Sequence, residues 1–487
     1  MLQSFLQQAS RIRVILLRLS DISYWRSVLA AAVFVLPAMA FGQDTDGVRI
    51  YNEELRVALD EQIPLAREMG FDAGGWFNFA FFNYDDASVP KVRTLGRYAL
   101  RGWASMNIQG VHRAYFRGLL QYDDWHGSDN PTNARGDDFD EQVERAWYEF
   151  DLGQLMANES GRRPDIGLRV RVGRQFTTIG SALVLSLPLD AIRFDVTTRD
   201  WDITTFLGQA IRNSINIDSS DRVAHRQERC FTGVEMVYKG LGQHRPYVFF
   251  LNNQDNTGSH PRDATQSYEY TSRYVGIGGS GPVIAPDLLY RAELVGEWGK
   301  TYSSGVTSGR DDVCAMALDA QLIYAPKAPT RPQIALEYLF GSGDGDRLGS
   351  PSSTVGGNLA GTRDNSFNAF GFRDTGIALS PRVSNIHIYS AEASFFPLHS
   401  VALLENLEVG TKVFFYQKAK SAGAITDASA INDAPWVGAE WDIYCNWRIT
   451  SDLAYTFRWG AFVPGSAYDG GDKTCRQFLY TGMVFSF

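Results

Sequence analysis

The sequence predicts an all-β protein: a transmembrane antiparallel β-barrel of about eighteen strands. The chain ends on an alternating segment, 479–487, in which Phe487, Phe485 and Met483 share one face and Tyr480 lies on the other. Segments of this kind recur along the chain, and the connectors between them alternate between long and short. Long external loops and short periplasmic turns are typical of barrels in bacterial outer membranes.

The barrel is expected to occupy residues 71–487. We expect strands at about 71–82, 95–109, 112–123, 142–153, 166–176, 189–197, 201–209, 230–239, 245–252, 269–279, 288–299, 314–324, 331–340, 386–396, 406–417, 436–448, 452–463 and 475–487. The connectors after odd-numbered strands are expected to be the long ones, and that between 340 and 385 is the longest. No stretch of 18 or more apolar residues occurs, so strands have to cross the membrane, and lipid permits this only in a closed barrel.

The N-terminal region has the pattern of a secretory signal peptide, expected over residues 1–42. Four arginines precede an apolar run, 28–40, which is shorter than the about 20 residues that a spanning helix needs. The run ends in Ala-Met-Ala, so cleavage could follow Ala40 or Gly42. A buried helix of a soluble protein is the alternative interpretation. Residues 43–70 are then a periplasmic lead-in whose apolar residues have roughly helical spacing.

Charge and cysteine usage exclude several classes of function. Residues 1–42 carry four arginines and one aspartate, so their removal changes the net charge from −9 to −12. An acidic exported chain without a basic tract is a poor nucleic-acid binder, and we expect none. The four cysteines have no C-x-x-C spacing, and the sequence predicts no metal site and no cofactor.

Strand parity assigns charged residues to the inside of the barrel. The expected inward bases are Arg101, Arg145, Arg169, Arg171, Arg193, Lys412 and Arg458, with Arg291 near a strand start. The expected inward acids are Glu149, Asp151, Asp195, Glu235, Glu293, Glu297, Asp319, Glu337, Glu392, Glu408, Glu440 and Asp442. The set could form a constriction between a cationic and an anionic wall, or it could be cross-strand ion pairs that fill a wet lumen.

The sequence predicts no catalytic residues. Of the seven histidines, His112 begins an expected strand and only His387 lies in the interior of one; Ser390, three residues after His387, falls on the opposite face of that strand. No G-x-S-x-G motif is present.

Several segments together resemble the alginate export family of outer-membrane proteins. They are 100–104 (Leu-Arg-Gly-Trp-Ala), 145–149, 171–175, 339–344, 361–363 with 370–373, 379–385, and 462–468 (Phe-Val-Pro-Gly-Ser-Ala-Tyr) before the terminal strand. The resemblance implies an eighteen-stranded monomeric porin that passes an anionic uronate polysaccharide through an arginine-rich constriction. It assigns that role to Arg101, Arg145, Arg171, Arg174, Arg363, Arg373 and Arg458. Arg193 is added to this set because strand parity places it inside the barrel; no motif of the family includes it.

Three details qualify this assignment. Arg174 breaks the parity of its strand and needs a bulge or the strand end to reach the lumen. Arg363 and Arg373 lie in the long external loop, part of which we expect to fold inward and narrow the pore. The long periplasmic plug that the alginate exporters carry between strands 16 and 17 is replaced here by the short connector 449–451, which weakens alginate as the cargo.

The leading expectation is therefore a passive outer-membrane channel for a polar, anionic solute or polysaccharide. One alternative is a general or uptake porin for small solutes, and another is a barrel that serves as a surface adhesin or scaffold. The expected partners are outer-membrane lipid, the solute and a possible periplasmic secretion complex.

Overall fold

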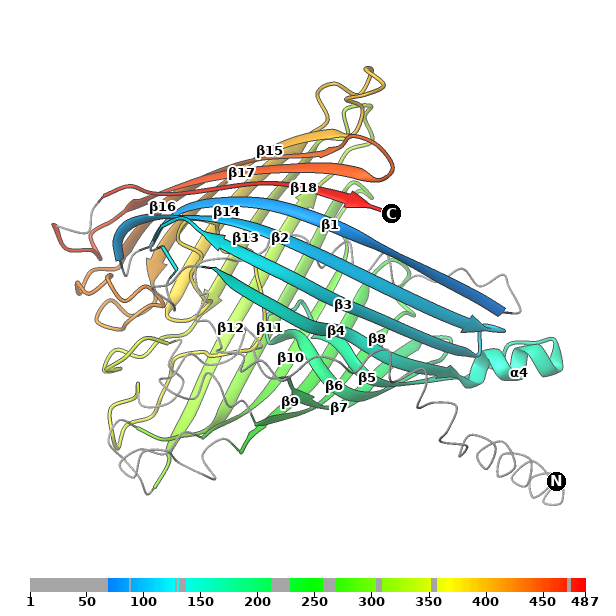
Figure 1. The fold of residues 1–487 in the computed structure, drawn as a ribbon. Helices are drawn as coiled ribbons and strands as arrows, with labels where there is room; N and C mark the ends of the chain where they lie inside the picture. The colour runs from blue at the N-terminus through cyan, green and yellow to red at the C-terminus, as the bar shows by residue number, and fades with distance from the viewer. Residues whose placement is uncertain are drawn as a thin grey trace. The chain divides into compact units, whose positions relative to one another are not determined.

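Eighteen antiparallel strands form one closed sheet in the computed structural model (Figure 1). The structure describes residues 69–86, 89–127, 129–130, 137–211, 228–256, 269–303, 309–351, 357–470 and 474–487. Each strand pairs with its neighbours in sequence, and β1 also pairs with β18. The predicted fold class is confirmed. The predicted signal peptide, and the lead-in except for residues 69 and 70, lie outside the described residues.

The strands have the following bounds: β1 Met69–Asp86, β2 Val89–Ile108, β3 His112–Trp125, β4 Asp138–Asp151, β5 Gly167–Ile179, β6 Leu185–Thr197, β7 Trp201–Ala210, β8 Arg229–Tyr238, β9 Arg245–Asp255, β10 Tyr270–Pro282, β11 Leu288–Thr301, β12 Asp311–Tyr324, β13 Gln333–Gly341, β14 Ile386–Phe395, β15 Leu407–Lys418, β16 Trp436–Arg448, β17 Leu453–Pro464 and β18 Arg476–Ser486. One helix, α4 (Leu152–Ser160), lies between β4 and β5. Within the described residues, no helix is long and apolar enough to cross a membrane.

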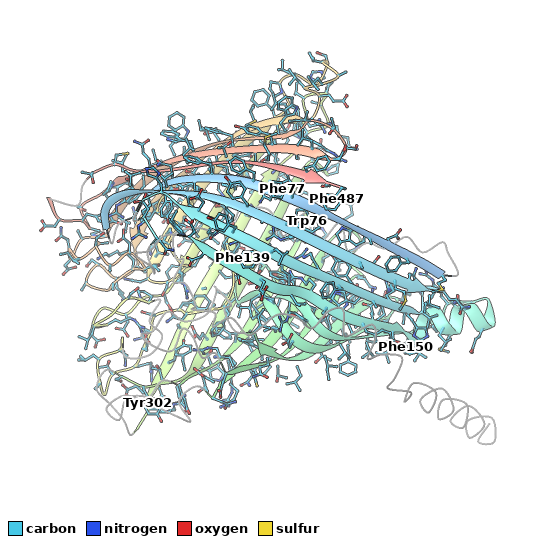
Figure 2. All side chains as sticks on the ribbon, viewed as in Figure 1. Trp76, Phe77, Phe139, Phe150, Tyr302 and Phe487 are labelled. Carbon is cyan, nitrogen blue, oxygen red and sulfur yellow. The ribbon has the colours of Figure 1, made fainter. Side chains whose placement is uncertain are left out.

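The last residue of the chain closes the barrel. The Gly75 N–H donates to the Phe487 carbonyl oxygen at 3.0 Å, and the Phe487 N–H donates to the Gly75 carbonyl oxygen at 2.9 Å. The register then continues through Trp76 opposite Ser486 and Phe77 opposite Phe485, and Figure 2 shows Phe487 beside Trp76 and Phe77. Closure leaves neither β1 nor β18 with an open edge, which hydrocarbon would not tolerate.

Side chains alternate between two solvents along each strand. On β18, Phe478 and Tyr480 are buried inside the barrel. Met483 and Phe485 are exposed on the outer face, which contacts lipid in the membrane. On β17, Arg458 is only 6% exposed and points inward. The parity derived from the sequence is thus observed in the closing strands, and polar inward positions imply a wet lumen.

Two connectors differ from the prediction of long odd-numbered loops. We expected about a dozen residues between the first two strands, but β1 ends at Asp86 and β2 begins at Val89. The segment between β5 and β6 is likewise only 180–184. From β6 onward, each odd connector is longer than its even neighbours, as predicted. The loop expected between the first two strands was too long because Asp85, Asp86 and Pro90 are residue types typical of turns. In the structure these residues belong to the strands, since β1 and β2 pair as far as Asp86 and Val89.

Gly75 supplies a test of the closure. A Cβ at this position would lie 2.6 Å from the Arg101 carbonyl oxygen and 2.7 Å from Cζ of Phe487. We expect Gly75→Val to lower the free energy of unfolding by about 1–3 kcal/mol, because it forces the β1–β18 seam apart. The measurement is denaturant unfolding in lipid vesicles.

The control for this test is Gly102→Val, since Gly102 is the cross-strand partner of Gly75 and a Cβ there would meet nothing within 4 Å. It should be neutral or slightly stabilising, because valine favours strands. Equal destabilisation by the two variants would contradict the closure argument.

Candidate functional site

The long connector between β13 and β14, residues 342–385, enters the barrel. Phe370 forms an isolated parallel bridge with Leu185: its N–H donates to the Val184 carbonyl oxygen at 2.8 Å, and its carbonyl oxygen accepts from the Ser186 N–H at 3.0 Å. Its ring packs in an apolar cluster with inward side chains of the barrel, among them Phe231. The prediction that part of this loop folds inward is confirmed.

Glutamates of the barrel wall hold the loop at two places. The Glu440 carboxylate on β16 accepts the N–H groups of Ile377, Ala378 and Leu379 at 2.6, 2.7 and 2.9 Å. Glu297 on β11 accepts the Asn368 N–H at 2.9 Å. Backbone N–H groups stabilise a buried carboxylate by charge-assisted hydrogen bonds, so these acids act as anchors.

The short β5–β6 connector is held in the same way. Glu235 on β8 accepts the Gly180 N–H at 2.6 Å, and Glu293 on β11 accepts the Ser181 N–H at 2.6 Å. Four of the acids predicted to face inward therefore hold loop backbone. Because donors already surround these carboxylates, they contribute less negative field to the lumen than their number suggests.

The part of the wall formed by β2 to β6 carries arginines. We call the inward guanidinium groups of β2 to β6 the arginine wall; its members are Arg93, Arg97, Arg101, Arg113, Arg117, Arg145, Arg169, Arg171 and Arg193. Within it, Arg101 Nε lies 3.0 Å from Glu144 Oε1, and Arg117 Nε lies 2.7 Å from Glu144 Oε2. Both guanidiniums are nearly buried.

Glu144 reaches these arginines because of a β-bulge. On β3, Arg117 pairs with Arg145 and the next residue, Gly118, pairs with Val143, so Glu144 is an extra residue in β4. A bulge of this kind turns two consecutive side chains toward one face. Simple alternation cannot place both Glu144 and Arg145 inside, which is why the sequence pattern missed Glu144.

Arg171 and Arg193 lie directly opposite each other on β5 and β6. Arg171 Nη2 contacts Glu149 Oε2 at 2.9 Å, and its Cζ lies 4.0 Å from the centroid of the Trp147 ring. Arg193 Nη2 contacts Asp195 Oδ1 at 2.8 Å. Their side chains remain 19% and 29% exposed, more than those of Arg101 and Arg117. Two like charges facing each other across strands repel, so an anion between them would be favoured.

The eight predicted site residues separate into groups. Arg101, Arg145, Arg171 and Arg193 lie together in the arginine wall. The other four lie elsewhere.

Two of these four lie in the loop. Arg373 donates from Nη1 to the Ser181 carbonyl oxygen at 3.0 Å and contacts Asp319 at 3.0 Å, so it joins the loop to the wall. Arg363 is exposed in the same loop.

The remaining two are Arg174 and Arg458. Arg174 stays on the outward face, where it contacts Asp190 at 2.8 Å, and it therefore does not reach the lumen. Arg458 faces inward beside Tyr444 of β16, with Cζ 5.4 Å from the ring centroid.

Four inward arginines were not expected from the sequence: Arg93, Arg97, Arg113 and Arg117. A usable signal existed, because Arg97 and Arg101 are four residues apart and so share a strand face. Arg113, Tyr115 and Arg117 share one face of β3, and the aromatic Tyr115 between the two arginines made this face look apolar in the sequence. His387 and Ser390 lie on opposite faces of β14, as expected. Among the described residues, no group of His, Cys, Asp or Glu side chains has an arrangement that could hold a metal ion.

Comparison with protein families now bears on this geometry. The alginate export family model matches residues 99–480, which is well over half of the chain. The chain belongs to the alginate export family. A search of curated proteins gave no match.

Solved structures agree on the fold of this alginate export protein. OccK8 (OprE) of Pseudomonas aeruginosa is 10% identical with a TM-score of 0.52, and the match covers 86% of this chain and 98% of that one. OccK2 (OpdF) of the same organism, in complex with glucuronate, is 13% identical with a TM-score of 0.50 over 86% and 98%. OpdK of Pseudomonas aeruginosa with vanillate is 10% identical with a TM-score of 0.51 over 86% and 100%. The protein is a porin-type barrel of the bacterial outer membrane.

Glu144 should be a strong determinant of the stability of the arginine wall. Glu144→Ala leaves the nearly buried Arg101 and Arg117 without their shared carboxylate, and we expect unfolding to become about 2–3 kcal/mol easier. Glu141→Ala, an exposed residue of the same strand, is the control and should change little. Equal unfolding midpoints for the two variants in lipid vesicles would show that Glu144 is not such a determinant.

Glu440 should control the position of the loop. Glu440→Ala removes the acceptor for three N–H groups, so the loop should leave its place and the single-channel conductance should rise. Glu440→Gln keeps one acceptor oxygen and should have a smaller effect. A conductance of the alanine variant equal to that of the wild type would contradict the anchoring role.

Proposed function

We propose that this protein is a passive outer-membrane channel that favours anionic, carboxylate-bearing solutes, and that the arginine wall is its selective surface. One observation carries the proposal: Arg171 and Arg193 face each other across β5 and β6 and remain partly exposed. A guanidinium presents a planar fork of donors that matches a carboxylate. Two such groups at one height of the lumen make a site where a carboxylate exchanges water for hydrogen bonds.

The inward loop strengthens this selectivity. Phe370 lies against the β6 side of the barrel, and Ile377 and Ala378 pack against the apolar cluster of β1, β2 and β18. A loop that spans the lumen between these places directs a solute along the uncovered polar wall. At such short range, the placement of individual charges decides selectivity more than the net charge of −9 does.

The similar structures support the choice of solute. OccK2 was solved with glucuronate and OpdK with vanillate, and both of these ligands carry a carboxylate. The family description names a uronate polymer as its exported cargo. We therefore propose a uronate unit or a carboxylate of similar size as the solute, moving by diffusion without a covalent step.

A small solute is a second candidate beside an extended polymer. The loop fixed across the lumen favours it, because a polymer needs a continuous wide path. The connector between β16 and β17 is only 449–452, so no plug at that place would have to open for either cargo.

Ion selectivity in planar bilayers tests the proposal. In a potassium chloride gradient, the reversal potential should show anion preference, and the double variant Arg171→Gln with Arg193→Gln should lose most of it. Glucuronate should reduce the wild-type current, and the double variant should need about tenfold more glucuronate for the same effect.

Arg174→Gln is the matched control, since Arg174 lies three residue pairs along the same ladder but on the outer face. Its selectivity should equal that of the wild type. Cation preference of the wild type, or equal effects of the inward and outward variants, would refute the proposed selective surface.

A further inference from the structure

The Trp147 side chain of β4 lies between an aromatic side chain of β3 and an arginine of β5. On the β3 side, Tyr115 is its cross-strand partner, and the two ring centroids are 5.7 Å apart with an angle of 21° between the planes. On the β5 side, Cζ of Arg171 lies 4.0 Å from the centroid of the Trp147 ring. This distance is close to the van der Waals separation of two carbon atoms, so the guanidinium group lies over the ring and not at its edge.

The backbone of β5 leaves this place to Arg171. Gly173 is the residue opposite Trp147, and Arg171 is the diagonal neighbour of Trp147 on the same face of the sheet. Gly173 has a φ of 124°, and a Cβ there would lie 2.2 Å from the Ala146 carbonyl oxygen. Because no side chain fits at Gly173, the Arg171 side chain covers the ring instead.

An aromatic ring and a carboxylate hold a guanidinium group in different ways. Glu149 accepts a hydrogen bond from Arg171 Nε at 2.9 Å and contacts Nη2 at 2.9 Å, so it uses N–H donors and offsets part of the charge. The donors of a guanidinium group lie in its plane, and a ring under the flat face uses none of them. The attraction of the ring for the charge is strongest where water is excluded, and Trp147 is only 5% exposed.

We propose that Trp147 is the positioning residue of the anion site: its ring holds the Arg171 guanidinium group in the orientation in which it meets a carboxylate. The inference rests on the proposed function, because it assigns Trp147 a part in selectivity. An arginine that is already ordered loses less conformational entropy when the solute binds. Arg193 is held instead by Asp195 of its own strand, so the ring acts on the Arg171 member of the pair.

Substitution of Trp147 tests the proposal with two independent readouts. Planar-bilayer recordings give the glucuronate concentration that halves the current. NMR of the full chain in detergent, with isotope-labelled arginine, gives the Nε–Hε signal of Arg171, which is identified by its loss in Arg171→Gln and is displaced by the ring current of Trp147.

Trp147→Leu should remove this displacement and raise the half-blocking glucuronate concentration about fivefold, because Arg171 then has to be ordered by the solute. Trp147→Phe keeps an aromatic face under the guanidinium group. It should keep most of the displacement and change the glucuronate concentration by less than about twofold.

Trp103→Leu is the matched control. Trp103 of β2 stacks on Tyr115 with ring centroids 6.3 Å apart, so this variant also removes an inward indole, but three strands away from Arg171. Its Arg171 signal and its glucuronate block should equal those of the wild type.

Three results would overturn the proposal: an unchanged Arg171 signal in Trp147→Leu, a changed signal with an unchanged glucuronate block, or equal losses in Trp147→Leu and Trp147→Phe. The last result would mean that the bulk of the indole matters and its aromatic face does not. If glucuronate does not block the wild-type channel, the proposed function fails and the selective role of Trp147 fails with it. The Nε–Hε signal then still decides whether the ring holds Arg171, so the two failures are distinguishable.

Discussion

Hydrocarbon offers no hydrogen-bond partners, so every backbone N–H and C=O group within the membrane has to be hydrogen-bonded inside the protein. This constraint determines the structure. It forces β1 onto β18, and the reciprocal bonds between Gly75 and Phe487 complete the ring. Once the ring is closed, every strand has a lipid face and a lumen face, and charge is directed to the lumen. The arginine wall and the carboxylate anchors are consequences of that division.

Inside the barrel, the acidic and the basic side chains have different roles. Glu235, Glu293, Glu297 and Glu440 accept backbone N–H groups and hold two connectors in place. In the arginine wall, Arg171 and Arg193 face each other and remain partly exposed, although each contacts a carboxylate of its own. A lumen that contains many acids can therefore favour an anion, because burial and hydrogen bonding determine which charges a solute meets.

Much of the fold could be predicted, because strand parity is local. Alternation along β16 and β17 placed Glu440 and Arg458 inside without any tertiary information. It failed at Glu144, where a bulge adds one residue to β4, and bulges depend on the register with the partner strand. Arg174 shows the opposite error: a family motif suggested the lumen, but the unbroken β5–β6 register keeps it outside with Asp190. The anchoring role of Glu440 could not be predicted either, since its partners are more than sixty residues away in the chain.

In the proposed function, the Arg171–Arg193 pair receives the carboxylate of the solute. A crystal structure of the protein soaked with glucuronate tests this assignment. We expect the glucuronate carboxylate between the two guanidinium groups on β5 and β6. A glucuronate bound elsewhere in the lumen, with this pair unoccupied, would contradict it.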